Sequence, residues 1–275
     1  MTPASTLNEL QDQIRAKYTD LSKRLQQVAE YVLDNKSSVA FETVQVIAKQ
    51  ADVPPSTLIR FASAFGFNGF NEMKQVFRNH LLEETSNYTD RVKLLKEMDE
   101  DSHTPDNPID ILHEFARANT NAMQQLSSQT PADKLNEAVE TLSKAKTIYV
   151  MGLGRSFSVA SYLTYALRHL NKRAFLIDGL GGMFKEQLSM VDADDVVIAI
   201  SFSPYAKDTT DISDSLAKSG TKQVIITDSP ISPLASFSDV CFVVKEAKVD
   251  AFRSQAASLC LAQTLAVSLA FHEQK

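Results

Sequence analysis

The second half of the chain begins with Thr147-Ile148-Tyr149-Val150-Met151-Gly152-Leu153-Gly154-Arg155-Ser156, and this segment indicates its fold class. An apolar run of strand character leads into two glycines, and a helical pattern begins near Phe157. A strand that turns through glycines into a helix makes an anion site, because unpaired backbone N–H groups and the positive end of the helix dipole point into one loop. We therefore expect the loop of residues 152–156 to hold a negatively charged group.

The loop pattern alone is compatible with two kinds of ligand, a phosphate group or a dinucleotide. Gly152 and Gly154 match the first two glycines of G-x-G-x-x-G, but the third glycine would fall on Phe157, whose ring obstructs a close pyrophosphate approach. Asp178, after the next apolar run, is the candidate ribose-binding acid in that alternative. A dinucleotide-binding enzyme is therefore an alternative that rests on an incomplete motif.

Further apolar runs of strand length follow, with helix-length segments between them. These runs are residues 174–177, 196–200, 224–226 and 240–244. Together with the first run they predict a flavodoxin-like, five-stranded parallel α/β sandwich of strand order 2-1-3-4-5. In that order the ligand site lies at the switch point between the first and third strands.

The switch point brings the loop after the first strand beside the loop after the third, Ser201-Phe202-Ser203-Pro204-Tyr205. Hydroxyls of Ser156, Ser201 and Ser203, with N–H groups at two helix starts, can surround a phosphate without a bidentate arginine. Arg155 and Lys207 either add charge or point to solvent. Each serine alone is most often a turn residue, but two serine-bearing loops at one switch point favour a ligand site.

The first part of the chain consists of helical patterns. Residues 6–17 and 21–33 have apolar positions at helical spacing, and two shorter patterns follow at 43–50 and 56–65. Pro55 suits the first position of the last of these, because its missing N–H would be unpaired there. Two short helices joined by a tight turn and supported by earlier helices form a helix-turn-helix, whose second helix would recognise DNA.

The charge distribution is compatible with DNA binding by this part. The net charge is −6, but the acidic excess falls mostly on residues 85–110, and basic residues outnumber acidic ones by two between Thr43 and Leu82. Such a patch gives modest, salt-sensitive phosphate binding in one copy and useful affinity in a dimer. The predicted DNA-binding residues are Lys49, Ser56, Thr57, Arg60, Ser63 and Lys74. A helical bundle with solvated charges is the alternative.

Three segments, Thr43–Val53, Pro55–Phe61 and Phe65–Phe70, resemble the helix-turn-helix domain of the RpiR family of bacterial transcription regulators. Pro54 occupies a position where that family usually has a serine, so a serine cap and its phosphate contact are missing. By this resemblance, Ser56 and Thr57 are the residues that would take over part of that role.

The second half resembles the sugar isomerase (SIS) domain, which binds phosphosugars and which RpiR regulators join to the helix-turn-helix domain. Ser156 matches the serine of the first phosphate loop, and Ser201 and Ser203 match the paired serines of S-x-S-G-x-T. Pro204 and Ala206 depart from that loop, and Thr209 or Tyr205 would replace the lost threonine hydroxyl. The predicted effector-binding residues are Gly154, Arg155, Ser156, Ser201, Phe202, Ser203, Tyr205 and Thr209.

The two resemblances imply an organisation of the whole chain. Residues 1–84 would form the helix-turn-helix domain, 85–108 a linker with at most a short helix over 91–98, and 109–275 the SIS-type phosphosugar-binding domain. The protein would be a DNA-binding transcription regulator of sugar metabolism, a homodimer or homotetramer whose operator affinity is controlled by a phosphorylated sugar.

A phosphosugar isomerase is the main enzymatic alternative. Such an enzyme needs an acid and a base on either side of the first two sugar carbons. The nearest candidates, His169, Asp178 and Glu186, form no recognisable pair in the sequence. We therefore expect a binding site without catalytic residues.

Composition indicates a globular protein without cofactor or metal. Hydrophobic residues make up 44% and charged residues 23%, which suits about two domains with ample cores. The five histidines are scattered, and Cys241 and Cys260 lie in apolar patterns typical of buried neutral thiols. Residues 1–10 lack the features of a secretion signal, and the interrupted apolar stretch 256–271 predicts a buried helix. We expect a cytoplasmic protein.

Overall fold

The chain forms two structural units, Met1–Thr104 and Pro105–Lys275. The structure is a computed structural model, and it describes residues 2–4, 6–85, 87–98, 107–250 and 252–274. No helix within these ranges is long and apolar enough to cross a membrane. The same ranges contain no group of three or more His, Cys, Asp or Glu side chains that is placed to hold a metal ion.

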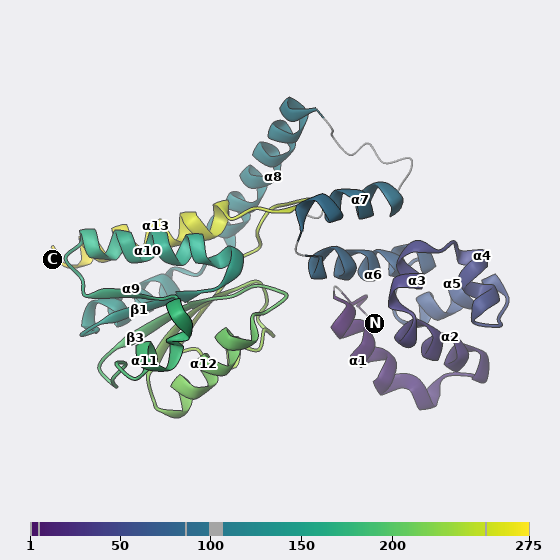
Figure 1. The fold of residues 1–275 in the computed structure, drawn as a ribbon, viewed down its shortest axis with the longest axis horizontal. Coiled ribbons are helices and arrows are strands. Elements are labelled where there is room, and N and C mark those ends of the chain that lie inside the picture. The colour runs from purple at the N-terminus through teal and green to yellow at the C-terminus, as the bar shows by residue number, and fades with distance from the viewer. Residues whose placement is uncertain (1, 5, 86, 99–106, 251, 275) are drawn as a thin grey trace. The chain divides into compact units, whose positions relative to one another are not determined.

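The first unit is built from helices, drawn in purple and blue in Figure 1. They are α1 (Leu7–Lys17), α2 (Lys23–Asp34), α3 (Lys36–Phe41), α4 (Val44–Gln50), α5 (Pro55–Ala64), α6 (Phe70–Glu84) and α7 (Tyr88–Met98). The hydroxyls of Thr6 and Thr43 accept hydrogen bonds from the N–H groups of Glu9 and Val46. Each hydroxyl therefore satisfies a backbone donor that the start of a helix leaves unpaired.

Aromatic side chains form the core of this unit. Phe61, Phe65, Phe70 and Phe77 are buried, and the rings of Phe61 and Phe65 lie 4.9 Å apart. Helix α5 packs on α2, α4 and α6. The turn between α4 and α5 contains Asp52 with a φ of 53°, a left-handed conformation that Asp tolerates. α4 and α5 form the predicted helix-turn-helix, with α5 in the recognition position.

Helix α7 occupies much of the segment that we predict as a linker. It packs on α3 and α6, and Arg91 is buried with its Nε donating to the carbonyl of Thr85. The sequence indicates only a short helix over 91–98, because the burial of a charged Arg91 cannot be foreseen from its type. The domain bounds 1–84, 85–108 and 109–275 stay a prediction.

The second unit is a parallel sheet between two layers of helices (Figure 1). Its helices are α8 (Pro108–Gln129), α9 (Ala132–Lys144), α10 (Phe157–His169), α11 (Phe184–Leu188), α12 (Lys207–Lys218) and α13 (Ala256–His272). The strands are β1 (Ile148–Gly152), β2 (Ala174–Ile177), β3 (Val196–Ile200), β4 (Lys222–Thr227) and β5 (Val240–Val243). Their order, β2-β1-β3-β4-β5, confirms the predicted topology.

Alternate residues of β1 face the two helix layers. Ile148 and Val150 pack with buried residues of α9, α10 and α13, whereas Tyr149 and Met151 pack with residues of α11 and α12. Both faces are apolar because both are covered, as is typical of parallel sheets. The predicted helix over 256–271 is confirmed as α13.

Two features of the second unit differ from the expectation. A short antiparallel pair, β6 (Lys248–Val249) and β7 (Phe252–Arg253), precedes α13, and strands of two residues leave no periodic signal in a sequence. The two thiols are less buried than we predict, since Cys260 lies on the exposed side of α13 and Cys241 in β5 is half-buried.

Candidate functional site

The loop after β1 depends on two glycines. A Cβ atom on Gly152 would lie 2.7 Å from the carbonyl oxygen of Ser156, so this position admits no side chain without a shift of the loop. Gly154 has a φ of +57°, in the left-handed region that other residues rarely adopt. The turn buries Ser156 at the start of α10, where its N–H donates to the carbonyl of Leu153 at 3.1 Å.

The loop after β3 is held by the aspartate that follows β4. The two carboxylate oxygens of Asp228 accept hydrogen bonds from the Ser203 N–H at 3.0 Å and the Tyr205 hydroxyl at 2.8 Å. Lys245 donates to the Asp228 carbonyl at 2.6 Å. Ser201 is buried directly after the strand. The segment after β4 thus fixes the conformation of the second serine loop.

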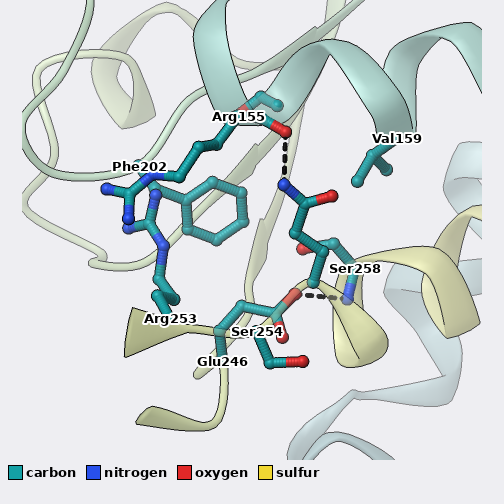
Figure 2. Close-up of a pocket in the computed structure, with 9 residues that line it drawn as sticks. Arg155, Val159, Phe202, Glu246, Arg253, Ser254 and Ser258 are labelled. Carbon is teal, nitrogen blue, oxygen red and sulfur yellow. Dashed lines mark hydrogen bonds between the residues drawn. The ribbon is translucent and has the colours of Figure 1, made fainter. Parts of the chain in front are cut away.

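A small pocket opens where these loops meet the start of α13 (Figure 2). Its walls come from the loop after β1, the loop after β3, the segment after β5, and the β7–α13 junction. The lining residues are Arg155, Ser156, Val159, Phe202, Glu246, Arg253, Ser254, Gln255 and Ser258. The pocket lies at the carboxyl edge of the sheet, next to the switch point between β1 and β3.

The sequence patterns do not predict the α13 side of this pocket. Glu246 accepts hydrogen bonds from the N–H groups of Ser258 at 2.7 Å and Ala257 at 3.2 Å, so its carboxylate caps α13 (Figure 2). Gln255 Nε2 donates to the Arg155 carbonyl at 2.5 Å and ties α13 to the first loop. The strand order could have predicted it, because the segment after the fifth strand also begins at the carboxyl edge of the sheet, where the ligand site is expected.

Arg253 links β7 to the second serine loop. One of its terminal nitrogens donates to the carbonyl of Ser203 at 3.0 Å, and its guanidinium carbon lies 4.8 Å from the centre of the Phe202 ring. The ring face and the carbonyl together fix the position of the guanidinium.

The predicted effector residues have different positions. Arg155, Ser156 and Phe202 line the pocket, with Gly154 next to them in the same loop. Ser201, Ser203 and Tyr205 belong to the loop that contributes Phe202.

Two residues on α12 contribute differently from the expectation. Thr209 is fully buried, and its hydroxyl has no hydrogen-bond partner among the described residues. Lys207 is exposed and pairs with Asp211 at 2.8 Å, which raises the pKa of Lys207. The charge of Lys207 is therefore paired with a carboxylate on its own helix.

The predicted DNA-binding residues separate into exposed and buried sets. Lys49, Ser56, Arg60 and Ser63 are exposed. Thr57 and Lys74 are buried, and Lys74 Nζ donates to the carbonyl of Glu42 at 2.5 Å near the end of α3. Burial removes Thr57 and Lys74 from the outer face, so we keep the prediction of DNA contact only for the four exposed residues.

Comparison with known proteins identifies both units. Residues 8–86 match the helix-turn-helix domain of the rpiR family, and residues 141–273 match the SIS domain. An uncharacterized HTH-type transcriptional regulator from Haemophilus influenzae is 27% identical over 84% of this chain and 78% of its own length.

Solved structures share the fold. The NanR protein of Vibrio vulnificus, solved in complex with ManNAc-6P, is 23% identical, with a TM-score of 0.59 and coverage of 96% of this chain and 93% of that chain. The sugar isomerase domain of an RpiR transcription factor from Sphaerobacter thermophilus is 25% identical, with a TM-score of 0.56 and coverage of 60% and 91%.

These findings define a class: a DNA-binding regulator in which a helix-turn-helix domain precedes a SIS domain. The chain belongs to the RpiR family of transcription regulators.

Proposed function

We propose that a phosphorylated sugar binds at the switch point of the second unit and that its binding controls the affinity of the helix-turn-helix for operator DNA. The observation that carries this proposal is the meeting of two serine-bearing loops at the carboxyl edges of β1 and β3. Ser156 and Ser201 are buried there, and α10 directs its N-terminal N–H groups toward the same edge. Buried hydroxyls and a helix N-terminus together suit a phosphate.

The site is one for binding and not for isomerisation. The His169 ring contacts the Tyr165 ring at the end of α10, with their centres 4.2 Å apart. Asp178 accepts hydrogen bonds from Gln187 and Leu180, and Glu186 is exposed on α11. None of these three lines the pocket. Glu246 does line it, but its carboxylate is engaged in capping α13. A proton-transfer pair across a sugar is therefore missing from the described part of the pocket.

The DNA-binding surface is the exposed side of α5 with Lys49 beside it. Ser56, Arg60 and Ser63 project from this side, opposite the buried Phe61. Two copies in a homodimer, or four in a homotetramer, would present such helices to a two-fold symmetric operator in the cytoplasm.

Sugar binding acts on DNA binding through a coupling free energy. An effector shifts the affinity at a second site by its differential affinity for two states of the protein, typically about 1 to 3 kcal/mol. NanR, which shares this fold, is solved with ManNAc-6P, but the case for this chain rests on its own loops.

The test is a binding titration of the full chain. Duplexes selected from a random pool serve as operator, and sugar phosphates are then added while DNA affinity is followed by fluorescence anisotropy. Ser201→Ala with Ser203→Ala should abolish the response to sugar and keep DNA binding. A thermal-shift panel supports the titration, because a ligand at 100 times its dissociation constant adds about 2.7 kcal/mol of stability. Stabilisation by dinucleotides alone, or sugar turnover, would overturn the proposal.

A further inference from the structure

The pocket contains two arginines that a serine-built phosphate cradle does not require. Arg155 comes from the loop after β1 and Arg253 from β7, and both line the pocket. Figure 2 shows their side chains reaching the same end of it, beside Phe202. Arg253 is fixed in place by the Ser203 carbonyl and the Phe202 ring. Two guanidinium groups at one end of a small pocket favour an anionic partner.

Arg155 is the more available of the two cations. Within the described residues, its guanidinium makes neither a hydrogen bond nor an ion pair, whereas its backbone carbonyl accepts from Gln255. The carbonyl contact holds the backbone while leaving the side chain to a ligand. The planar fork of an arginine matches the two oxygens of a carboxylate.

The acidic residue of the pocket does not neutralise this end. The two carboxylate oxygens of Glu246 accept from the N–H groups of Ala257 and Ser258, at the positive end of the α13 dipole. The negative charge of Glu246 is thus matched by α13, while Arg155 and Arg253 contribute two positive charges on the other side of the pocket.

A buried hydroxyl adds an independent indication of a polar ligand. Ser258 lines the pocket and is 1% exposed, and its Oγ has no hydrogen-bond partner among the described residues. Leaving a buried hydroxyl unsatisfied is costly, so such groups in a pocket are commonly satisfied by a ligand or an ordered water.

We infer that the effector is a phosphorylated sugar acid, with its phosphate at the serine loops and its carboxylate between Arg155 and Arg253. A hydroxyl of the same molecule reaches Ser258. The inference rests on the proposed function, since it names the class of phosphosugar that the site selects. The competing assignment gives both arginines to the phosphate, in compensation for the threonine hydroxyl that Ala206 lacks.

Matched ligand pairs distinguish the two assignments. Isothermal titration of the full chain would compare 6-phosphogluconate with glucose 6-phosphate, and 5-phosphoarabinonate with arabinose 5-phosphate. The members of each pair differ by a carboxylate at the first carbon. We expect the acid of at least one pair to bind about tenfold to a hundredfold more tightly, as charge-assisted hydrogen bonds allow.

Variants assign the preference to the arginines. Arg155→Gln and Arg253→Gln should each reduce the ratio of the affinity for the acid to the affinity for the member without the carboxylate, by about tenfold or more. Arg253→Lys keeps the charge without the fork and should lose part of the preference. Arg173→Gln is the matched control, because Arg173 is exposed and lies outside the pocket.

Each remaining outcome overturns a distinct statement. Equal binding of the members with and without the carboxylate, in both pairs, removes the inference and keeps the proposed function. Equal weakening of both members and of inorganic phosphate by the arginine variants assigns the arginines to the phosphate and also removes it. Absence of binding by every phosphosugar removes the proposed function together with the inference.

Discussion

The two units place their functional residues in opposite ways. In the first unit, Ser56, Arg60 and Ser63 project from a single helix whose other side enters an aromatic core. In the second unit, the pocket joins segments that are far apart in the chain, such as Arg155 and Gln255, whose hydrogen bond spans 100 positions. A helix surface therefore depends on local periodicity and a supporting core, whereas the pocket depends on the sheet topology and on the exact course of several loops.

The largest effect is expected from loss of the aromatic core. Phe61→Ala removes a fully buried ring from α5 and should cost the first unit about 3–5 kcal/mol of unfolding free energy. DNA binding should be lost with it. Calorimetry of the full chain should show an earlier transition for the first unit and an unchanged one for the second.

Ile59→Ala is the control for this variant, because Ile59 is the next apolar position on α5 but is 52% exposed. It should shift the transition only slightly. If Phe61→Ala also weakens phosphosugar binding, the pocket depends on the first unit and the contrast between the units fails.

The same contrast explains which parts of the structure the sequence patterns predict. Helical spacing predicts α4 and α5 to within a residue, because the spacing of the apolar residues records which side of each helix is buried. Apolar runs predict the five strands, and the strand order follows from the general rules of α/β folds. Burial of polar side chains such as Thr57 and Lys74 is decided by packing against distant helices, which a local pattern does not contain.

The sequence predicts only the part of the pocket that the strand order brings together. Ser156 and Phe202 follow recognisable strands, so topology alone brings their loops together. Arg253 lies in the two-residue strand β7, which has no sequence signal, and Ser258 follows in α13. Their approach to the pocket depends on hydrogen bonds such as that from Arg253 to Ser203.

The next effect concerns the course of the first loop. Gly152→Ala places a methyl group 2.7 Å from the Ser156 carbonyl oxygen, so the loop must move. We expect a loss of about 1–3 kcal/mol in the stability of the second unit. Phosphosugar affinity should fall about tenfold, equivalent to about 1.4 kcal/mol, when measured by isothermal titration.

Gly69→Ala is the matched glycine control, because Gly69 has an extended φ of 175° and nothing within 4 Å of an added Cβ. It should leave sugar affinity unchanged. Tight sugar binding by Gly152→Ala would show that the pocket tolerates a displaced loop, in conflict with its dependence on loop geometry.

A smaller effect is expected on the helix surface. Arg60→Ala should weaken operator binding about tenfold and reduce the slope of log affinity against log salt by about one, because one phosphate contact is lost. Arg24→Ala removes the same charge from an exposed position on α2 and serves as control. Anisotropy titrations at several salt concentrations measure both. An unchanged slope for Arg60→Ala would take Arg60 off the DNA-binding surface.

The smallest effect concerns Lys74, a buried cation of the first unit. Burial, followed by the nearby charge of Arg78, lowers the pKa of Lys74 below its usual value of 10.5. Below the lowered pKa, Lys74 is protonated in both the folded and the unfolded chain. The free energy of unfolding is then reduced by the full cost of burying the ammonium group. Between that pKa and 10.5 the unfolded chain binds more protons, so the free energy of unfolding gains a contribution that increases with pH.

Lys74→Met should remove this contribution and leave operator affinity within about twofold, in contrast to Arg60→Ala. The difference in unfolding free energy between wild type and Lys74→Met, measured by urea titration from neutral pH to about pH 10.5, should therefore change in favour of the wild type as pH rises. A difference that does not change with pH would show that burial does not lower the pKa of Lys74. Loss of DNA affinity with intact stability would return Lys74 to the recognition surface, because a buried residue that supports α3 through the Glu42 carbonyl should act on stability first.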